Sequence, residues 1–139
     1  MQFASLGSGS KGNGTLIESG KTTLLVDCGF SLKQTQLRLE RLGRSIEDLD
    51  AILVTHEHSD HIGGVRRLSH KVGIPVWMSS GTAREAERRE GLFDSVRIVC
   101  GHEPFTIGEI EVTPYHVPHD AKEPRSEERR VGKECRSRW

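Results

Sequence analysis

The sequence predicts an α/β (α+β) fold in which helices cover a β-sheet. Two observations support this class. Short apolar segments near the N-terminus follow one another as hairpins, and later apolar segments alternate with segments of helical periodicity. The predicted strands are residues 2–5, 15–18, 22–27, 51–55, 75–78, 96–99, 105–107 and 110–113. At 139 residues the chain has room for at most one domain.

Turn residues separate the predicted strands. The turn Ser19-Gly20-Lys21 joins the strands over 15–18 and 22–27, and Gly108 lies between the last two strands. Residues 51–55 form a short apolar run that contains β-branched residues, which is typical of a buried strand.

Helices are predicted between the later strands. Ser31 and Gln34 have the spacing of a capping box, which starts a helix that ends at Gly43. A second helix over 61–72 ends at Gly73, a polar helix covers 81–90, and residues 45–48 start a short helical turn. The first of these helices has one apolar face, formed by Leu32, Leu39 and Leu42 together with Thr35.

The composition indicates a cytoplasmic protein. No run of 18 or more apolar residues occurs, so no membrane span and no membrane partner are expected, and the N-terminus lacks a signal-peptide pattern. Cys28 and Cys100 are too few and too far apart in sequence for a disulfide framework. We interpret Cys28 as a small buried hydrophobic residue, with a role as metal ligand as the less favoured alternative.

Residues 55–64 contain a dense group of metal-binding side chains. His56, His58, Asp60 and His61 fall within six positions, directly after the strand predicted over 51–55. Imidazole and carboxylate groups are the ligands that zinc and similar divalent ions prefer. His56 and His58 point the same way in an extended chain, while Asp60 and His61 begin the next helical segment and diverge, which suits a second ion. So many polar groups in one place are hard to explain by packing alone.

This motif resembles the signature of the metallo-β-lactamase fold superfamily. Three further segments agree with one branch of it, the YycJ/WalJ-like hydrolases. They are Ser-Gly-Ser-Lys-Gly-Asn at 8–13, Leu-Leu-Val-Asp-Cys-Gly at 24–29 and His-Asp-Ala-Lys-Glu-Pro at 119–124. Members of this branch are bacterial cytoplasmic proteins that are related to RNase J and tRNase Z and described as 5′-to-3′ DNA exonucleases. The resemblance covers residues 1–124 and implies the N-terminal half of an αββα sandwich, because the complete fold needs roughly 200–250 residues.

The resemblance also implies a set of ligands for two divalent ions, with Zn²⁺ expected and Mn²⁺ as the alternative. His56, His58 and His119 would bind the first ion, with His116 as the competitor of His119. Asp60 and His61 would bind the second ion, and Asp60 would act in catalysis together with a metal-bound hydroxide. The family has a bridging aspartate and one more histidine further along, and no residue of this chain matches either.

Residues 125–139 depart from the family pattern directly after Pro124. This segment is similar to the in-frame translation of a common sequencing adapter, so we expect it to be an artefactual tail. A natural basic tail is the alternative. The segment holds six of the 20 Lys and Arg residues and three of the 20 Asp and Glu residues, so residues 1–124 carry a formal charge of −3. The bulk charge therefore shows no basic footprint for nucleic acid, although two divalent ions would supply positive charge locally.

The glycine-rich segment 7–12 matches the G-x-G-x-x-G pattern of dinucleotide-binding proteins. That motif must open a helix, whereas a hairpin-like, β-branched segment follows here, so we reject a dinucleotide site. In the family this loop lies near the metal site, and Ser8, Ser10 and Asn13 are candidates for binding substrate phosphate. A tight connection between strands is an equal alternative.

Other polar residues allow two interpretations each. Asp27, at the end of a strand, is expected either to orient a metal-binding histidine or to cap a turn. Two arginine-rich groups on predicted helices are interpreted as solvated faces, with a track for the DNA backbone as the alternative. They are Arg66, Arg67 and Lys71, and Arg84, Arg88 and Arg89.

These observations predict a dinuclear metal-dependent hydrolase that acts as a phosphodiesterase on DNA, with nucleic acid as its substrate. The first alternative is hydrolysis of a thioester, lactone or lactam on the same fold. The second is a catalytically inactive, truncated metal-binding fragment, and we expect the 139-residue chain itself to be weakly active or inactive. The oligomeric state is not predicted by the sequence.

Overall fold

The computed structural model describes residues 1–9, 12–55, 58–101 and 103–114. Six strands form one sheet in chain order: β1 (Gln2–Gly7), β2 (Gly14–Ser19), β3 (Thr22–Val26), β4 (Ala51–Leu53), β5 (Val76–Ser79) and β6 (Val96–Val99). The first three strands pair antiparallel, and the sheet continues parallel from β3 to β6. This change of direction follows from the connections, because turns join the early strands and helical segments join the later ones.

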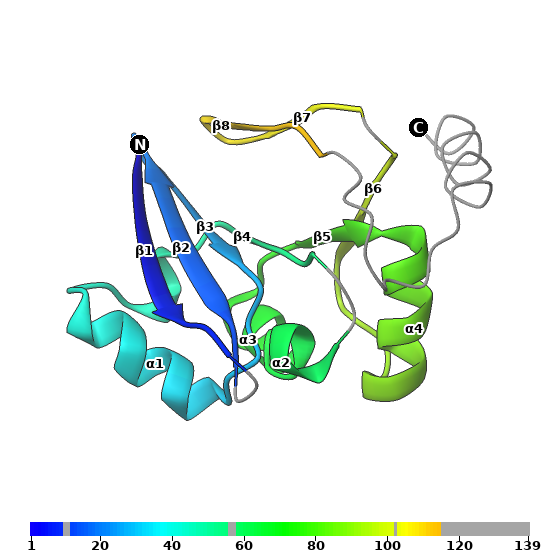
Figure 1. The fold of residues 1–139 in the computed structure, drawn as a ribbon, viewed down its shortest axis with the longest axis horizontal. Coiled ribbons are helices and arrows are strands. Elements are labelled where there is room, and N and C mark those ends of the chain that lie inside the picture. The colour runs from blue at the N-terminus through cyan, green and yellow to red at the C-terminus, as the bar shows by residue number, and fades with distance from the viewer. Residues whose placement is uncertain (10–11, 56–57, 102, 115–139) are drawn as a thin grey trace.

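Helical segments connect the parallel strands. They are α1 (Leu32–Arg41), the 3₁₀ turn η1 (Ile46–Asp48), α2 (Ser59–Ile62), α3 (Val65–Val72) and α4 (Ser80–Glu90). Figure 1 shows the α-helices below the sheet and the hairpin of β7 (Phe105–Ile107) and β8 (Ile110–Val112) above it. The order of layers is therefore helices, a six-stranded sheet and a two-stranded sheet. This arrangement confirms the predicted mixed α/β class.

Alternate residues of the strands supply two apolar clusters. Leu25 and Ile52 belong to the larger cluster, which includes the buried faces of the helices. Their neighbours Leu24 and Ala51 pack instead with Ile107 and Ile110 of the hairpin. Successive side chains of a strand point to opposite faces, so a sheet with almost continuous apolar strands can bury both faces.

The predicted caps of α1 are present. The Ser31 hydroxyl accepts a hydrogen bond from the Gln34 N–H at 3.2 Å, and Gly43 adopts a left-handed φ of 74° beyond the helix end. Thr35 and Leu39 are fully buried, as the predicted apolar face requires. Leu42 does not belong to this face, since it follows the last helical residue and is 39% exposed.

The single helix predicted over 61–72 is wrong, because the structure has two helices there. α2 ends at Ile62, and α3 begins at Val65 after Gly63 and Gly64. The break brings the backbone at Gly64 against the Phe30 carbonyl oxygen, which would lie 1.8 Å from a Cβ atom at this position. Only glycine permits so close an approach. The strand predicted over 51–55 is also shorter, because its ladder ends at Leu53.

Residues 125–139, where a tail was predicted, lie outside the described residues. No helix in the described part of the chain has the length and apolar character needed to span a membrane.

Candidate metal centre

The candidate site lies at one edge of the sheet, where the parallel strands β3 and β4 both end. Asp27 follows β3 directly, and the segment that contains the metal-binding motif follows β4. In α/β sheets, the carboxyl ends of parallel strands are the usual position of binding sites. The sheet therefore brings together residues that lie more than 30 positions apart in the sequence.

Asp27 has a left-handed backbone conformation with φ of 64°, and among the described residues it is the one non-glycine with positive φ. Such a conformation costs roughly 1–3 kcal/mol, although aspartate adopts it more readily than most residues. Its N–H donates to the Leu53 carbonyl oxygen at 2.7 Å, which ties the residue to β4. Its side chain is buried and turned toward the segment that follows β4.

Among the described residues, Thr55 and His61 form three hydrogen bonds with the Asp27 carboxylate. Oδ1 accepts from the Thr55 N–H at 2.8 Å, and Oδ2 accepts from the Thr55 hydroxyl at 2.6 Å. Oδ2 also lies 2.7 Å from Nδ1 of His61. Both interpretations of Asp27 made from the sequence therefore hold, since it caps the chain at Thr55 and contacts a predicted metal ligand.

This contact determines which nitrogen of His61 is available to an ion. A carboxylate accepts hydrogen bonds, so Nδ1 is the donor in this contact, and in the neutral ring Nε2 would carry the lone pair. Nε2 lies 3.7 Å from Oδ2 of Asp60. A histidine that donates its other ring N–H to a carboxylate is the usual arrangement of a metal ligand. The two predicted ligands His61 and Asp60 thus lie side by side.

Asp60 is fixed by the glycine-rich loop. The side-chain amide of Asn13 donates to Asp60 Oδ2 at 2.9 Å, and the Asn13 N–H donates to the Asp60 carbonyl oxygen at 2.7 Å. The Asn13 amide is itself oriented, because its Oδ1 accepts from the Gly9 N–H at 3.1 Å. The loop that follows β1 leads into strand β2 and not into a helix, which agrees with the rejection of a dinucleotide motif.

Backbone contacts hold α2 against the segment after β3. The Cys28 N–H donates to the His61 carbonyl oxygen, and the Gly64 N–H donates to the Cys28 carbonyl oxygen, each at 2.8 Å. At Gly29 a Cβ atom would lie 2.0 Å from the Asp60 carbonyl oxygen. The two glycines thus allow the backbones to meet directly behind the predicted ligands.

Cys28 faces the interior. It is fully buried, and its Sγ lies 3.2 Å from the Thr35 hydroxyl on α1. Burial raises the pKa of this thiol, which disfavours the thiolate that a metal ligand requires. These facts favour the interpretation of Cys28 as a small buried residue.

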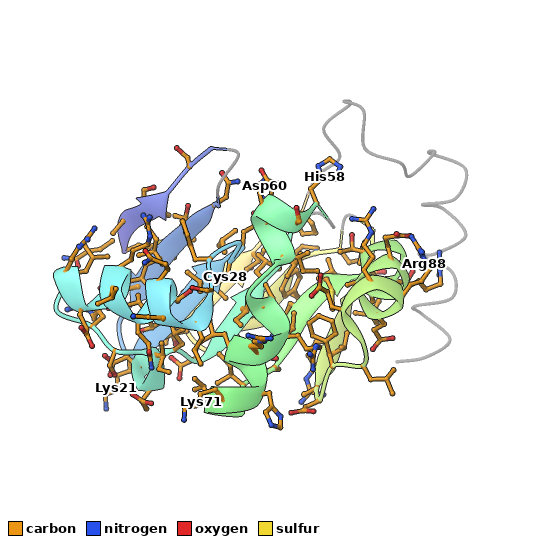
Figure 2. The ribbon with its side chains drawn as sticks, turned by 90° about the horizontal axis from the view of Figure 1, so that it is seen from below. Lys21, Cys28, His58, Asp60, Lys71 and Arg88 are labelled. Atoms are coloured by element: carbon orange, nitrogen blue, oxygen red, sulfur yellow. The ribbon has the colours of Figure 1, made fainter. Side chains whose placement is uncertain are left out.

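His58 is exposed and immediately precedes α2, where its carbonyl oxygen accepts from the His61 N–H at 2.8 Å. Figure 2 shows His58 and Asp60 at the same end of α2. Ser8 is also exposed. The predicted residues His56, His119 and Ser10, together with the competitor His116, lie outside the described residues. Within the described part, no group of three or more His, Cys, Asp or Glu side chains is placed to hold an ion.

Sequence reasoning predicted the ligands but missed how the predicted ligands are supported. Asn13 is predicted from the sequence as a candidate for binding substrate phosphate. Its contact with Asp60 spans 47 positions of sequence. Nothing in the loop sequence itself specifies that partner. The glycines at 29 and 64 carried a weak signal, because a glycine with no turn assigned to it often marks a close approach of two backbones.

A family model described as metallo-beta-lactamase superfamily matches residues 7–134. The exodeoxyribonuclease WalJ of Streptococcus pneumoniae serotype 2 (strain D39 / NCTC 7466) is 41% identical, over 88% of this chain and 47% of WalJ. The exodeoxyribonuclease YycJ of Bacillus anthracis is 39% identical, over 89% of this chain and 48% of YycJ. The anti-Pycsar protein Apyc1 of Paenibacillus sp. (strain J14) is 42% identical, over 77% of this chain and 51% of Apyc1. The chain thus spans about half the length of these curated relatives.

A similar fold occurs among solved structures. The Rm3 metallo-beta-lactamase superposes with a TM-score of 0.68 over 81% of this chain and 48% of that chain. The sequence identity is 23%, so this likeness concerns the fold alone.

Proposed function

Because this chain belongs to the metallo-beta-lactamase superfamily, we propose that it carries the metal-binding site of a hydrolase that cleaves phosphodiester bonds in DNA from the 5′ end. Two relatives with about 40% identity are named exodeoxyribonucleases, which supports this substrate above others. The observation that carries the proposal is the hydrogen bond from His61 to Asp27, with Nε2 of His61 3.7 Å from Oδ2 of Asp60.

Two described residues, His61 and Asp60, offer donor groups that suit a divalent ion. An imidazole and a carboxylate are suitable donors for zinc, and both are already oriented by neighbours that are not ligands themselves. His56, His58 and His119 would hold one ion, and Asp60 and His61 the other. When bound, such ions supply Lewis acidity and positive charge next to the scissile phosphate. Zn²⁺ is the preferred metal on the chemistry of this donor set, with Mn²⁺ as the alternative.

The chain's own residues prepare the site in three ways. Asp27 keeps the proton of His61 at Nδ1, so that Nε2 always faces Asp60. Asn13 holds the Asp60 carboxylate in one orientation, which limits the free energy lost in ordering it when a ligand binds. Thr55 donates twice to Asp27 and thereby keeps the carboxylate in place.

The test is metal binding and hydrolysis by the purified chain. The metal-free protein is titrated with Zn²⁺ and Mn²⁺, and it is then assayed on 5′-phosphorylated DNA and on thioester, lactone and lactam substrates. We expect two ions to bind when all predicted ligands are intact, and we expect any hydrolysis, which should be weak in this chain, to be fastest on DNA. Preference for one of the other substrates would overturn the assignment to DNA, and metal binding without any hydrolysis would support the inactive fragment.

His58→Ala tests the ligand assignment. This substitution should abolish binding at the first site, because His58 is one of its three predicted ligands. His70→Ala is the matched control, since His70 is an exposed histidine on α3 that pairs with Asp94 at 2.6 Å. Full metal content and activity in the His58 variant would contradict the assignment.

A further inference from the structure

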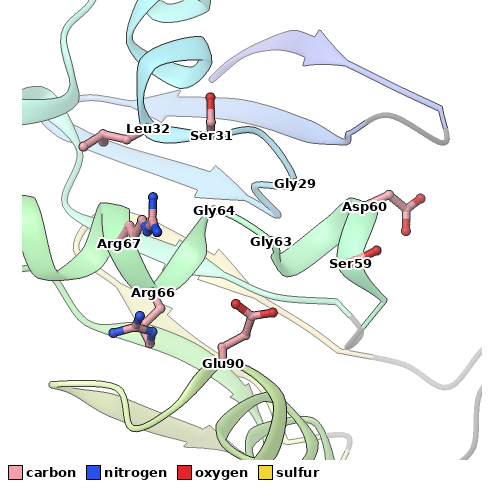
Figure 3. A pocket seen from close by; sticks show the side chains of 10 residues that line it. All are labelled: Gly29, Ser31, Leu32, Ser59, Asp60, Gly63, Gly64, Arg66, Arg67 and Glu90. Carbon is pink, nitrogen blue, oxygen red and sulfur yellow. The ribbon is translucent and has the colours of Figure 1, made fainter.

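A hollow of about 450 Å³ lies beside the candidate metal centre. Its size falls within the roughly 300–1,000 Å³ that is usual for ligand pockets. The start of α1, the connection from α2 to α3 and the end of α4 surround it. Figure 3 shows that the side chains of Ser31, Arg66, Arg67 and Glu90 come from these elements, with Asp60 on α2 at one side. The hollow therefore adjoins a predicted metal ligand.

The positive charge of the hollow is gathered at the start of α3, whereas the two carboxylates in its lining, Asp60 and Glu90, come from α2 and α4. Arg66 and Arg67 both lie in the first turn of α3, which contains no acidic residue. α1 also begins at the hollow without an acidic residue in its first turn. The start of a helix carries partial positive charge and normally attracts acidic groups, so two arginines there raise an already positive potential.

The two arginines lack internal partners in the described part of the chain. The Nε atom of Arg66 is buried without a hydrogen-bond acceptor, while the Arg66 side chain as a whole is half-buried and Arg67 is exposed. Neither guanidinium forms an ion pair with Glu90, although that carboxylate also lines the hollow. By contrast, Arg88 and Arg89 on α4 both pair with Glu85. A buried polar nitrogen without an acceptor costs free energy, which an anion in the hollow would offset.

We propose that this hollow binds a phosphate group of the nucleic-acid strand next to the bond that is cleaved, through Arg66 and Arg67. The proposal rests on the proposed function, since a nuclease substrate supplies a further phosphate close to the scissile one. A guanidinium group matches the geometry of phosphate oxygens and stays charged at every relevant pH. Asp60 lines the hollow, and its carboxylate projects from α2 away from the two arginines (Figure 3), so a strand that passes over α2 would reach both sites.

The sequence predicts Arg66, Arg67 and Lys71 as one basic group, but the structure places them at two ends of α3. Arg66 and Arg67 line the hollow, whereas Lys71 lies at the other end of α3, far from Asp60 (Figure 2). The third member of the group is therefore outside the proposed site, and Lys71→Ala should leave the binding of DNA unchanged.

The experiment measures the affinity of the whole chain for a fluorescent 5′-phosphorylated DNA oligonucleotide at several salt concentrations. A chelator is present, so that neither metal binding nor hydrolysis enters the result. Arg67→Ala and Arg66→Lys are compared with Arg41→Ala, which removes an exposed arginine from the last turn of α1. We expect Arg67→Ala to weaken binding about tenfold and to reduce the slope of log affinity against log salt by about 1. Arg66→Lys should weaken binding less, and Arg41→Ala should change neither quantity.

Glu90→Gln separates this proposal from a purely structural role of the arginines. If the hollow binds phosphate, removal of a negative charge from its wall should strengthen binding of the oligonucleotide. If Arg66 and Arg67 serve only to neutralise Glu90, the substitution should leave binding unchanged and alter only stability. That result would overturn the proposal.

Two further outcomes would also overturn it. The first is equal binding by the wild-type chain and the Arg67 variant, and the second is no binding by the wild-type chain at all. Inorganic phosphate serves as competitor to identify the source of the anion. Competition at concentrations similar to those of the oligonucleotide would indicate a site for free phosphate and would contradict a strand-binding role. If the wild-type chain binds the oligonucleotide in the presence of chelator but does not hydrolyse it when metal is present, that result would count against the proposed function alone.

Discussion

At the scale of single residues, the arrangement around Asp27 carries most of the functional information. One carboxylate accepts from the backbone and hydroxyl of Thr55 and contacts His61. Its backbone occupies a conformation that few residues other than glycine adopt. A strained residue whose side chain orients a predicted ligand is typical of a functional site.

Asp27→Asn tests that role. Asparagine keeps the shape of the side chain but no longer requires a proton on Nδ1 of His61, so the ring loses its fixed tautomer. We expect the affinity for the second ion to fall about 10- to 100-fold, as measured by competition with a chromophoric chelator.

Asp50→Asn is the matched control for this experiment. Asp50 also accepts a hydrogen bond from the backbone, the Thr23 N–H at 2.7 Å, but it lies before β4, at the other end of that strand. This variant should keep the metal affinity of the wild type. An equal loss of affinity in both variants would show that general destabilisation is the cause.

Cys28 gives a second prediction at this scale. Burial raises the pKa of its thiol, so the reactive thiolate is scarce in the folded protein. We expect iodoacetamide to modify Cys28 slowly at neutral pH and rapidly after unfolding in urea, as followed by mass spectrometry of the peptides. Equal rates in both conditions would mean that the thiol is accessible.

At the scale of elements, the break between α2 and α3 positions the site. The predicted continuous helix would carry the chain past Gly63 and Gly64 without a bend. The break instead places the backbone of α2 against residues 28–30, where it is held by hydrogen bonds from Cys28 and Gly64. A helical pattern in sequence does not reveal such a break, because it depends on what the helix meets in space.

Gly64→Ala should therefore be costly. Its Cβ would lie 1.8 Å from the Phe30 carbonyl oxygen, and a backbone atom cannot move aside cheaply. We expect a loss of at least about 3 kcal/mol in the free energy of unfolding, measured with urea. Gly73→Ala is the comparison, because it has a φ of 78° but no neighbour within 4 Å. It should cost about 1–2 kcal/mol from backbone strain alone. Similar losses in the two variants would refute the close contact.

At the scale of the whole molecule, the sheet is buried on both faces, with helices on one side and the β7–β8 hairpin on the other. Trp77 of β5 stacks on Phe105 of β7 with ring centroids 4.9 Å apart, which fixes the hairpin over the sheet. At the tip of the hairpin, Glu109 accepts from the Lys21 N–H at 2.6 Å. The first three layers of the implied sandwich are thus assembled from residues 1–114.

An ion pair between β2 and the segment after α1 gives a prediction for pH dependence. Arg44 donates to both carboxylate oxygens of Glu18, one of them at 2.8 Å, and this lowers the pKa of Glu18 below its ordinary 4.5. The folded protein therefore binds this proton less tightly than the unfolded chain. The stabilisation of the folded protein by this ion pair is present above pH 4.5. It is lost as the pH falls through the lowered pKa of Glu18.

Arg44→Gln measures that contribution. At neutral pH the variant should be slightly less stable than the wild type, because the pair is partly exposed and solvent screens it. The difference should vanish in acid, as followed by urea unfolding at each pH. Arg41→Gln serves as the control and should show no such trend. A difference that stays constant with pH would exclude the ion pair as its cause.

The sequence alone determined the class of the fold, most strands and caps, and the identity of the predicted ligands. These signals are local, since alternation, capping residues and the spacing of His58, Asp60 and His61 are all read within a few positions. The tertiary structure decided how the ligands are supported. The partners Asp27 and Asn13 lie 34 and 47 positions away from His61 and Asp60, and only the pairing of strands brings them close. Likewise, the split of α2 from α3 follows from direct contact between two backbones, which leaves no periodic pattern in the sequence.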